Sequence, residues 1–234
     1  VCVGEPWNSL AAYAGVGVIA LTTSTIWRSG PEKVVGMRTD WADAHPDVVS
    51  RLIRALYAAA LWCGDEANRA DLAELLAQPE HLGQPAPIME QALAGRQAVA
   101  DRRAALPRAG VLMFGGTAAT FPWASHALWF YSQMVRWGHV VASPVAERAA
   151  RRAYRPDLYR AALKGMDVAL PSANAKVEGA LTAPTPVAST NARLVLGPDG
   201  FFDGLIFDPD RIDEYIAGFE VPKQPFMAPK PAGA

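Results

Sequence analysis

The five residues Gly4-Glu5-Pro6-Trp7-Asn8 have the types and spacing needed to hold a small anion. They follow the apolar residues Val1–Val3 and precede a short helical pattern. Pro6 suits the first helical position, because a proline has no N–H to leave unpaired. A helix N-terminus offers free N–H groups and about half a positive charge. The amides of Trp7 and Asn8 would then face an anion, and the Trp7 ring would wall its pocket. The same residues also fit a plain strand-to-helix turn with Trp7 in the core.

Glu5 conflicts with a simple anion site, because a carboxylate repels an anion unless it is paired or protonated. Two arrangements would remove the conflict. Glu5 would pair with a basic residue nearby, or it would help to bind a cation that accompanies the anion. The sequence leaves both arrangements open. Glu5, Pro6 and Trp7 are therefore candidate ligand-binding residues.

The composition excludes several classes of protein. Of 234 residues, 51% are hydrophobic and 19% are charged, which allows a sizeable core. The 22 Lys and Arg residues nearly balance the 23 Asp and Glu residues, so no net positive field would attract nucleic acid directly. No run reaches the ~20 apolar residues that a membrane-spanning helix needs.

Signatures of catalysis and of metal or cofactor binding are missing from the sequence. It contains no G-x-S-x-G, no H-E-x-x-H and no P-loop, and Gly115-Gly116 lacks the residues that would complete a phosphate cradle. Cys2 and Cys63 are neither paired as C-x-x-C nor near a histidine at metal-ligand spacing. We therefore expect no enzyme activity, no cofactor and no metal site.

The hydrophobic pattern changes from strand-like to helix-like near Pro46. Beyond it, apolar residues such as Val49, Leu52 and Leu56 recur at the helical period of 3.6 residues. The predicted strands are 1–4, 18–22 and 34–37. The predicted helices are 6–14, 46–62, 69–77, 87–95, 121–137, one that begins at 144, 156–165 and 208–217. Three short strands do not form a good sheet alone, and the chain begins inside an apolar run. We therefore expect these strands to complete an α/β sheet whose earlier strands lie upstream.

Two long segments lack a regular pattern. Residues 96–110 are basic and predict a loop, and residues 170–200 are rich in Pro, Ser, Thr, Ala and Asn. A loop as long as 170–200 is unusual inside a compact domain. We expect it to wrap over a surface and to pack on another part of the protein.

Several motifs together resemble the nitrate- and bicarbonate-binding proteins of ABC transporters. Besides residues 4–8, they are Ile26-Trp27, Pro31-Glu32-Lys33-Val34, Phe121-Pro122-Trp123, Ser125-His126, Trp129-Phe130, Gln133-Met134-Val135-Arg136-Trp137-Gly138 and Phe207-Asp208-Pro209. Each motif is weak alone, but the set occurs in the family's order over nearly the whole chain. The resemblance implies the C-terminal portion of a type II periplasmic-binding-protein fold, which is α/β with few strands near the start and then mostly helical.

The resemblance also implies three regions and a function. Residues 1–45 would form the end of the second lobe and the strands that cross back to the first lobe. Residues 46–221 would be a helical C-terminal region that packs on the lobes, and residues 222–234 would be a proline-rich tail. The protein would bind a small oxyanion, nitrate or nitrite or else bicarbonate, and would deliver it to the membrane subunits of an ABC transporter at the periplasmic face of the inner membrane.

A second group with the same fold gives an alternative. Cytoplasmic nitrate/nitrite sensors bind and restrain an RNA-binding antiterminator protein until the anion arrives. The segment Leu196–Gly204 looks more similar to these sensors than to transport proteins. If this resemblance holds, the partner is the antiterminator and the protein is cytoplasmic.

The resemblance finally implies a cation in the helix 46–62, where the family's nitrate binders carry a lysine. The nearest basic residue is Arg54, whose planar guanidinium fork suits a planar trigonal anion. The alternative is that Arg54 shares a solvated helix face with Asp47, Ser50 and Arg51. Arg54 therefore joins the candidate ligand-binding residues.

Two further features are expected to be structural. His126 stands among aromatic residues, where a lone histidine is more commonly a core or interface residue than a ligand. The run of Arg148, Arg151, Arg152 and Arg155 lacks the interleaved aromatic residues of a nucleic-acid platform and fits a solvated face.

Overall fold

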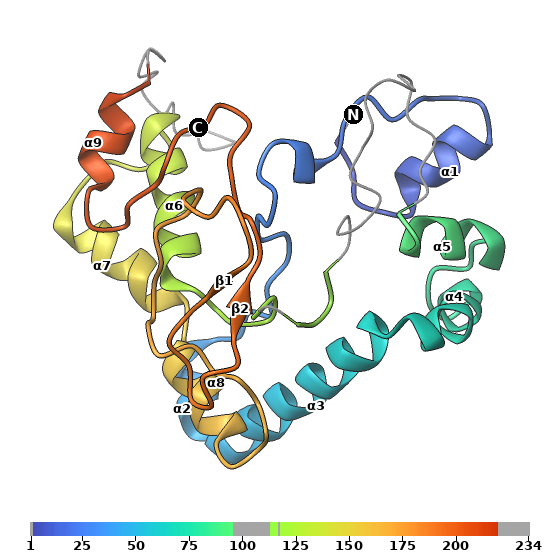
Figure 1. Ribbon diagram of the computed structural model, residues 1–234, viewed down its shortest axis with the longest axis horizontal. Helices are drawn as coiled ribbons and strands as arrows, with labels where there is room; N and C mark the ends of the chain where they lie inside the picture. Colours follow the sequence, from blue (N-terminus) through green and yellow to red (C-terminus); the bar gives the residue numbers. More distant parts are fainter. Residues whose placement is uncertain (1, 96–112, 117, 220–234) are drawn as a thin grey trace, which may run out of the picture. The chain divides into compact units, whose positions relative to one another are not determined.

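The computed structural model describes residues 2–95, 113–116 and 118–219 (Figure 1). The predicted loop 96–110 and the predicted tail 222–234 lie wholly outside these residues. The chain forms two compact units, Val1–Gly30 with Met37–Thr120 and Pro31–Gly36 with Phe121–Ala234. The three regions implied by the resemblance were defined by the lobes of a whole binding protein, which these compact units do not test, so they stay a prediction.

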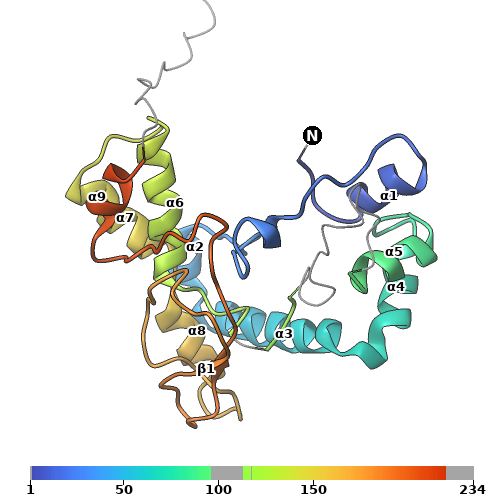
Figure 2. The same cartoon turned by 45° about the horizontal axis from the view of Figure 1, so that its top comes forward.

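The first unit is helical. Its elements are α1 (Trp7–Tyr13), η1 (Thr23–Thr25), α2 (Thr39–Ala44), α3 (Pro46–Gly64), η2 (Glu66–Asn68), α4 (Arg69–Ala77) and α5 (Ala86–Leu93). Its small core consists of Ala73 from α4 with Ile88 and Met89 from α5, and Leu10 of α1 packs against it. Helix α5 contacts both α1 and α4, as Figures 1 and 2 show.

Helix α3 confirms the predicted helix 46–62, but most of its apolar stripe is not covered. Val49 is buried, whereas Leu52 and Leu56 are 37% and 42% exposed. Gly115 lies against the same helix, where an added Cβ would come within 3.1 Å of the Ala60 carbonyl oxygen. The close approach of two backbones explains a glycine at position 115 without any phosphate-binding role.

The predicted strands at 1–4, 18–22 and 34–37 are not paired in a sheet within the described residues. The run Val16–Leu21 is continuously apolar, which is typical of a strand buried on both faces between neighbouring strands. Here Ile19 is buried, but Val16 and Val18 are 82% and 72% exposed. Ile19 forms a single β-bridge, but no strand runs through 18–22 among the described residues, although the sequence is that of a central strand.

The second unit contains the strands that the structure does show. They are β1 (Thr185–Pro186) and β2 (Val195–Leu196), which pair antiparallel. Its helices are α6 (Ala124–Arg136), α7 (Pro144–Ala153), α8 (Pro156–Leu163) and α9 (Ile212–Ala217). No helix among the residues described here has the length and apolar character required to cross a membrane.

Helix α6 is the centre of the second unit. It buries Leu128, Tyr131 and Val135, which lie on one face, and it packs against α7 and α9. Phe207 is fully buried in the same core. The predicted helix 208–217 is shorter than expected, because the Asp208 side chain accepts a hydrogen bond from the Asp210 N–H and forms a turn before α9 begins.

The irregular segment 170–200 is held by its own unit. The Arg160 guanidinium of α8 donates hydrogen bonds to the carbonyl oxygens of Pro171 and Ala173 at 2.8 and 2.6 Å and to the Asn174 side chain at 2.6 Å. The Ala124 N–H at the start of α6 donates to the Asn174 carbonyl oxygen at 2.8 Å. These contacts satisfy backbone groups that a sheet or helix would otherwise satisfy.

Candidate functional site

The turn at residues 4–8 is closed by its own side chains. The Trp7 N–H donates to the Gly4 carbonyl oxygen at 3.2 Å, and the Asn8 side-chain amide donates to the Val3 carbonyl oxygen at 2.7 Å. A Glu5 carboxylate oxygen accepts a hydrogen bond from the Ser9 N–H at 3.4 Å. The Glu5 carboxylate thus lies at the N-terminus of α1, the position that was predicted for the anion.

This arrangement bears on both options for Glu5. No basic side chain among the described residues pairs with it, and its partner is the first turn of α1. Pro6 is buried, whereas Trp7 is 48% exposed and does not belong to the core. The Trp7 ring is therefore available to a ligand, while the N-terminus of α1 already holds a carboxylate.

Arg54 lies on α3, in different surroundings from the turn. Helix α3 packs on α2 and η2, whereas α1 packs on α5, so helix packing does not bring Arg54 to the turn. Arg54 is exposed, and the neighbouring Arg51 forms an exposed ion pair with Asp47 at 3.1 Å. These surroundings match the solvated face that the sequence also allowed.

Lys33 is a cation that the sequence reasoning did not select. It stands inside the motif Pro31-Glu32-Lys33-Val34, its side chain is 79% exposed, and its ammonium group pairs with the Glu32 carboxylate. Its position within a motif of the resemblance was the signal that could have identified it.

A buried cluster of charged groups joins α6 to the irregular segment of the second unit. Glu178 and Asp199 are 0% and 1% exposed, and the Lys176 ammonium group donates to both carboxylates. The Ser125 hydroxyl donates to Glu178 at 2.6 Å, and His126 Nε2 lies 3.5 Å from the same carboxylate. The prediction that His126 is structural agrees with its place in this cluster.

The charges of the cluster decide the ionisation of Glu178. Burial acts to raise the pKa of Glu178, but the hydrogen bond and charge of His126 and the charge of Lys176 outweigh it and lower the pKa below its ordinary value of 4.5. The carboxylate is therefore charged in the folded protein. This cluster fastens the segment to α6 and has the character of a structural ion network rather than of an anion site.

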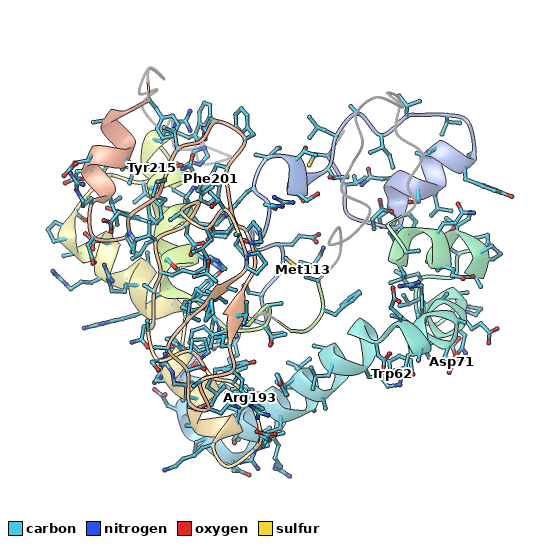
Figure 3. The ribbon with its side chains drawn as sticks, in the orientation of Figure 1. Trp62, Asp71, Met113, Arg193, Phe201 and Tyr215 are labelled. Atoms are coloured by element: carbon cyan, nitrogen blue, oxygen red, sulfur yellow. The ribbon has the colours of Figure 1, made fainter. Side chains whose placement is uncertain are left out.

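The segment Leu196–Gly204, which favours the sensor alternative, is part of this packing. Leu196 belongs to β2, and the Asp199 side chain accepts a hydrogen bond from the Leu181 N–H at 2.8 Å. The Phe201 ring stacks on Trp129 with 6.0 Å between centroids, and Trp129 donates to the Tyr215 hydroxyl at 3.2 Å. Phe201 and Tyr215 are labelled in Figure 3. Packing within the second unit therefore accounts for several residues of this segment.

Gly179 adds a strict packing requirement to the same region. Its φ of +84° lies in the left-handed region, and an added Cβ would come within 2.8 Å of the Leu205 carbonyl oxygen and 2.7 Å of the Phe201 ring. Only glycine fits this position without displacing its neighbours.

The surroundings of Cys63 do not favour thiol chemistry. Partial burial raises the pKa of the Cys63 thiol, which disfavours the reactive thiolate. Within residues 2–95, 113–116 and 118–219, no three His, Cys, Asp or Glu side chains are grouped so that they could hold a metal ion.

Comparison with known proteins identifies the relatives of the chain. Residues 1–77 match the model of the NMT1-like family. The nitrate/nitrite binding protein NrtA of Synechococcus elongatus (strain ATCC 33912 / PCC 7942 / FACHB-805) is 30% identical over 221 residues, which are 94% of this chain and 45% of the relative. The bicarbonate-binding protein CmpA of the same organism is 28% identical over 226 residues, covering 93% of this chain and 46% of the relative.

A solved structure confirms the fold. The crystal structure of the periplasmic nitrate-binding protein NrtA from Synechocystis PCC 6803 matches with a TM-score of 0.75 and 26% identity, covering 94% of this chain and 53% of that chain. The chain has the fold of part of a periplasmic binding protein, as the sequence predicted. It spans about half the length of the relatives that it matches.

Proposed function

We propose that this chain, which resembles the nitrate- and bicarbonate-binding proteins over nearly its whole length, forms part of a binding protein for a small oxyanion that serves an ABC-type uptake system. The observation that supports the proposal most strongly is the continuous match to such proteins over 94% of the chain. Nitrate or nitrite is the proposed ligand. Bicarbonate is the competing one, because relatives of both kinds match over similar lengths.

The chemistry of a small oxyanion sets what the site must supply. It needs a cation or several N–H donors and partial exclusion of water. Trp7 would exclude water with its half-exposed ring, next to Glu5 and Pro6. Since Glu5 already occupies the N-terminus of α1, the positive charge must come from a side chain. Arg54 and Lys33 are the two candidates.

Isothermal titration calorimetry would test the ligand. We expect nitrate to bind when the chain is joined to the remaining part of the NrtA relative, and to bind much more weakly to the 234 residues alone. Bicarbonate titrated in the same way would decide between the two anions. Tight nitrate binding by the 234 residues alone would show that the site is misplaced, and no binding of either anion by the joined protein would refute the function.

Variants of the joined protein would identify the cation. Lys33→Ala and Arg54→Ala each remove one candidate charge, and Arg51→Ala is the matched control because it removes an exposed arginine from the same helix. The variant that removes the ligand contact should weaken nitrate binding at least tenfold, as expected when a charge-assisted contact worth about 1.5 kcal/mol or more is lost. An affinity unchanged by Arg54→Ala would reject Arg54.

The sensor alternative predicts a different partner for the same ligand site. A sensor would bind an antiterminator protein and release it when the anion binds. A transport component would instead stimulate ATP hydrolysis by its transporter when the anion binds. Measuring both responses with the joined protein would separate these functions.

A further inference from the structure

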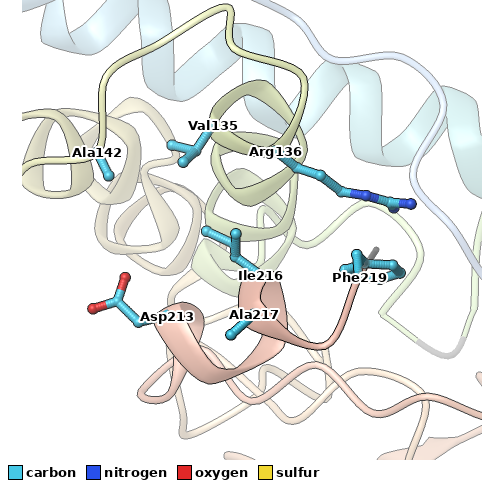
Figure 4. Close-up of a pocket in the computed structure, with 7 residues that line it drawn as sticks. All are labelled: Val135, Arg136, Ala142, Asp213, Ile216, Ala217 and Phe219. Carbon is cyan, nitrogen blue, oxygen red and sulfur yellow. The ribbon is translucent and has the colours of Figure 1, made fainter. Parts of the chain in front are cut away.

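A cavity of about 370 Å³ lies in the second unit, beside α6 and α9 (Figure 4). Its size falls within the range of about 300–1,000 Å³ that is usual for small-molecule sites. Most of its lining is apolar, and one cation and one carboxylate complete it. The lining residues are Val135, Arg136, Ala142, Asp213, Ile216, Ala217 and Phe219.

Arg136 is held in place, and no carboxylate of the described residues forms an ion pair with it. Its guanidinium carbon lies 3.5 Å from the centre of the Phe219 ring, and its Nη1 donates to the Gln133 side chain at 3.2 Å. Its Nε is buried and has no hydrogen-bond acceptor among the described residues. A buried donor without an acceptor is costly, so it is usually matched by a group that the protein chain does not supply.

Other partly buried arginines of the chain are paired differently. The side chains of Arg69 and Arg151 are 29% and 39% exposed, and they pair with Glu66 and Glu147 at 2.6 and 3.4 Å. Within the described part of the chain, no carboxylate lies within ion-pair distance of Arg136. The planar guanidinium, whose buried Nε has no acceptor among the described residues, therefore suits a planar anion such as a carboxylate.

We propose that this cavity binds a small monocarboxylate with a short apolar chain. The carboxylate would accept hydrogen bonds from Arg136, and the apolar chain would lie against Val135 and Ile216. Asp213 lies at the other end of the cavity from Arg136 and Phe219 (Figure 4). Its carboxylate would repel a second anionic group there, which favours a monocarboxylate over a dicarboxylate.

This site is separate from the oxyanion site of the proposed function. None of its lining residues belongs to the set Glu5, Pro6, Trp7 and Arg54. Nitrate carries no apolar chain, so it would gain nothing from the apolar walls. The inference therefore stands whether or not the chain contributes to nitrate binding. A nitrate titration tests the proposed function, and a butyrate titration tests this cavity.

Butyrate is the probe that tests the site, with methyl NMR of the 234-residue chain as the readout. We expect saturable shifts of the Val135 and Ile216 methyl signals, and at least tenfold weaker binding in Arg136→Gln. Arg136→Lys keeps the charge but loses the fork, so it should bind with intermediate affinity. Arg148→Gln, which removes an exposed arginine of α7, is the matched control and should leave binding unchanged.

Two further ligands make the test more specific. Butyramide has the same apolar chain without the charge and should not bind, and succinate should bind more weakly than butyrate. Asp213→Asn should remove the disadvantage of succinate, and this variant keeps the test valid if Arg136→Gln does not fold. The proposal would be overturned if the folded wild-type chain showed no saturable butyrate shifts. It would also be overturned if Arg136→Lys gave the same shifts as wild type and succinate bound as well as butyrate.

Discussion

Replacing Lys176 by methionine should destabilise the second unit more than any exposed substitution. The change keeps most of the side-chain volume but leaves the buried carboxylates of Glu178 and Asp199 without their shared cation. Removing one partner of a buried ion pair costs about 3–5 kcal/mol. Because the Lys176 side chain is 17% exposed, we expect the lower end, about 3 kcal/mol.

Amide hydrogen exchange measures this loss in one unit at a time. About 3 kcal/mol corresponds to an acceleration of roughly 100-fold for the most protected amides of α6. The amides of α4 and α5 in the first unit are the internal reference and should change little. Lys164→Met, which removes an exposed lysine, is the matched control.

A double variant separates the charge effect from lost packing. In Lys176→Met/Glu178→Gln one of the two stranded carboxylates is neutral, so the loss should be smaller than in Lys176→Met alone. A double variant as unstable as the sum of the two single variants, or an α6 whose exchange is unchanged in Lys176→Met, would refute this view of the cluster.

Three more changes have expected outcomes. The folded-state pKa of Glu178 lies below its ordinary value of 4.5, so the cluster should contribute stability above that pH and lose it as the pH falls through the lower folded-state pKa. Urea unfolding at a series of pH values measures this loss, and Glu178→Gln should make it smaller. Gly179→Ala should cost at least 2 kcal/mol by the same assay, about 1 from the positive φ and the rest from the clash with Phe201; a loss within about 0.5 kcal/mol would contradict the packing. Val18→Lys should leave stability unchanged and should reduce self-association of the chain in analytical ultracentrifugation, since this side chain is 72% exposed.

The helices were more predictable from the sequence than the strands, for a physical reason. The backbone hydrogen bonds of a helix are local, so the stripe from Val49 and the proline at position 46 suffice to predict α3. A strand needs a partner that can be distant in the chain. Val16–Leu21 has the apolar sequence of a central strand, but its pattern cannot state whether neighbouring strands are present.

The irregular segment of the second unit shows a different limit of sequence reasoning. Its composition predicted the absence of regular structure, but not that it would be fastened internally. The fastening groups are far apart in the chain: Ser125 and Glu178 are 53 residues apart, and Lys176 and Asp199 are 23 apart. Taken singly, each of these residues fits a solvated surface, and only the fold brings them into one buried cluster.

The candidate site shows why a motif can identify relatives without identifying ligand contacts. Residues 4–8 are part of the resemblance, yet Glu5 accepts the Ser9 N–H and Trp7 donates to Gly4 within the turn. Part of the motif is thus explained by the geometry of one turn, which any relative with that turn would need. A ligand contact has to be a group that the fold leaves unsatisfied, and by this criterion the buried Nε of Arg136 is a stronger indication of a bound anion than the N-terminus of α1.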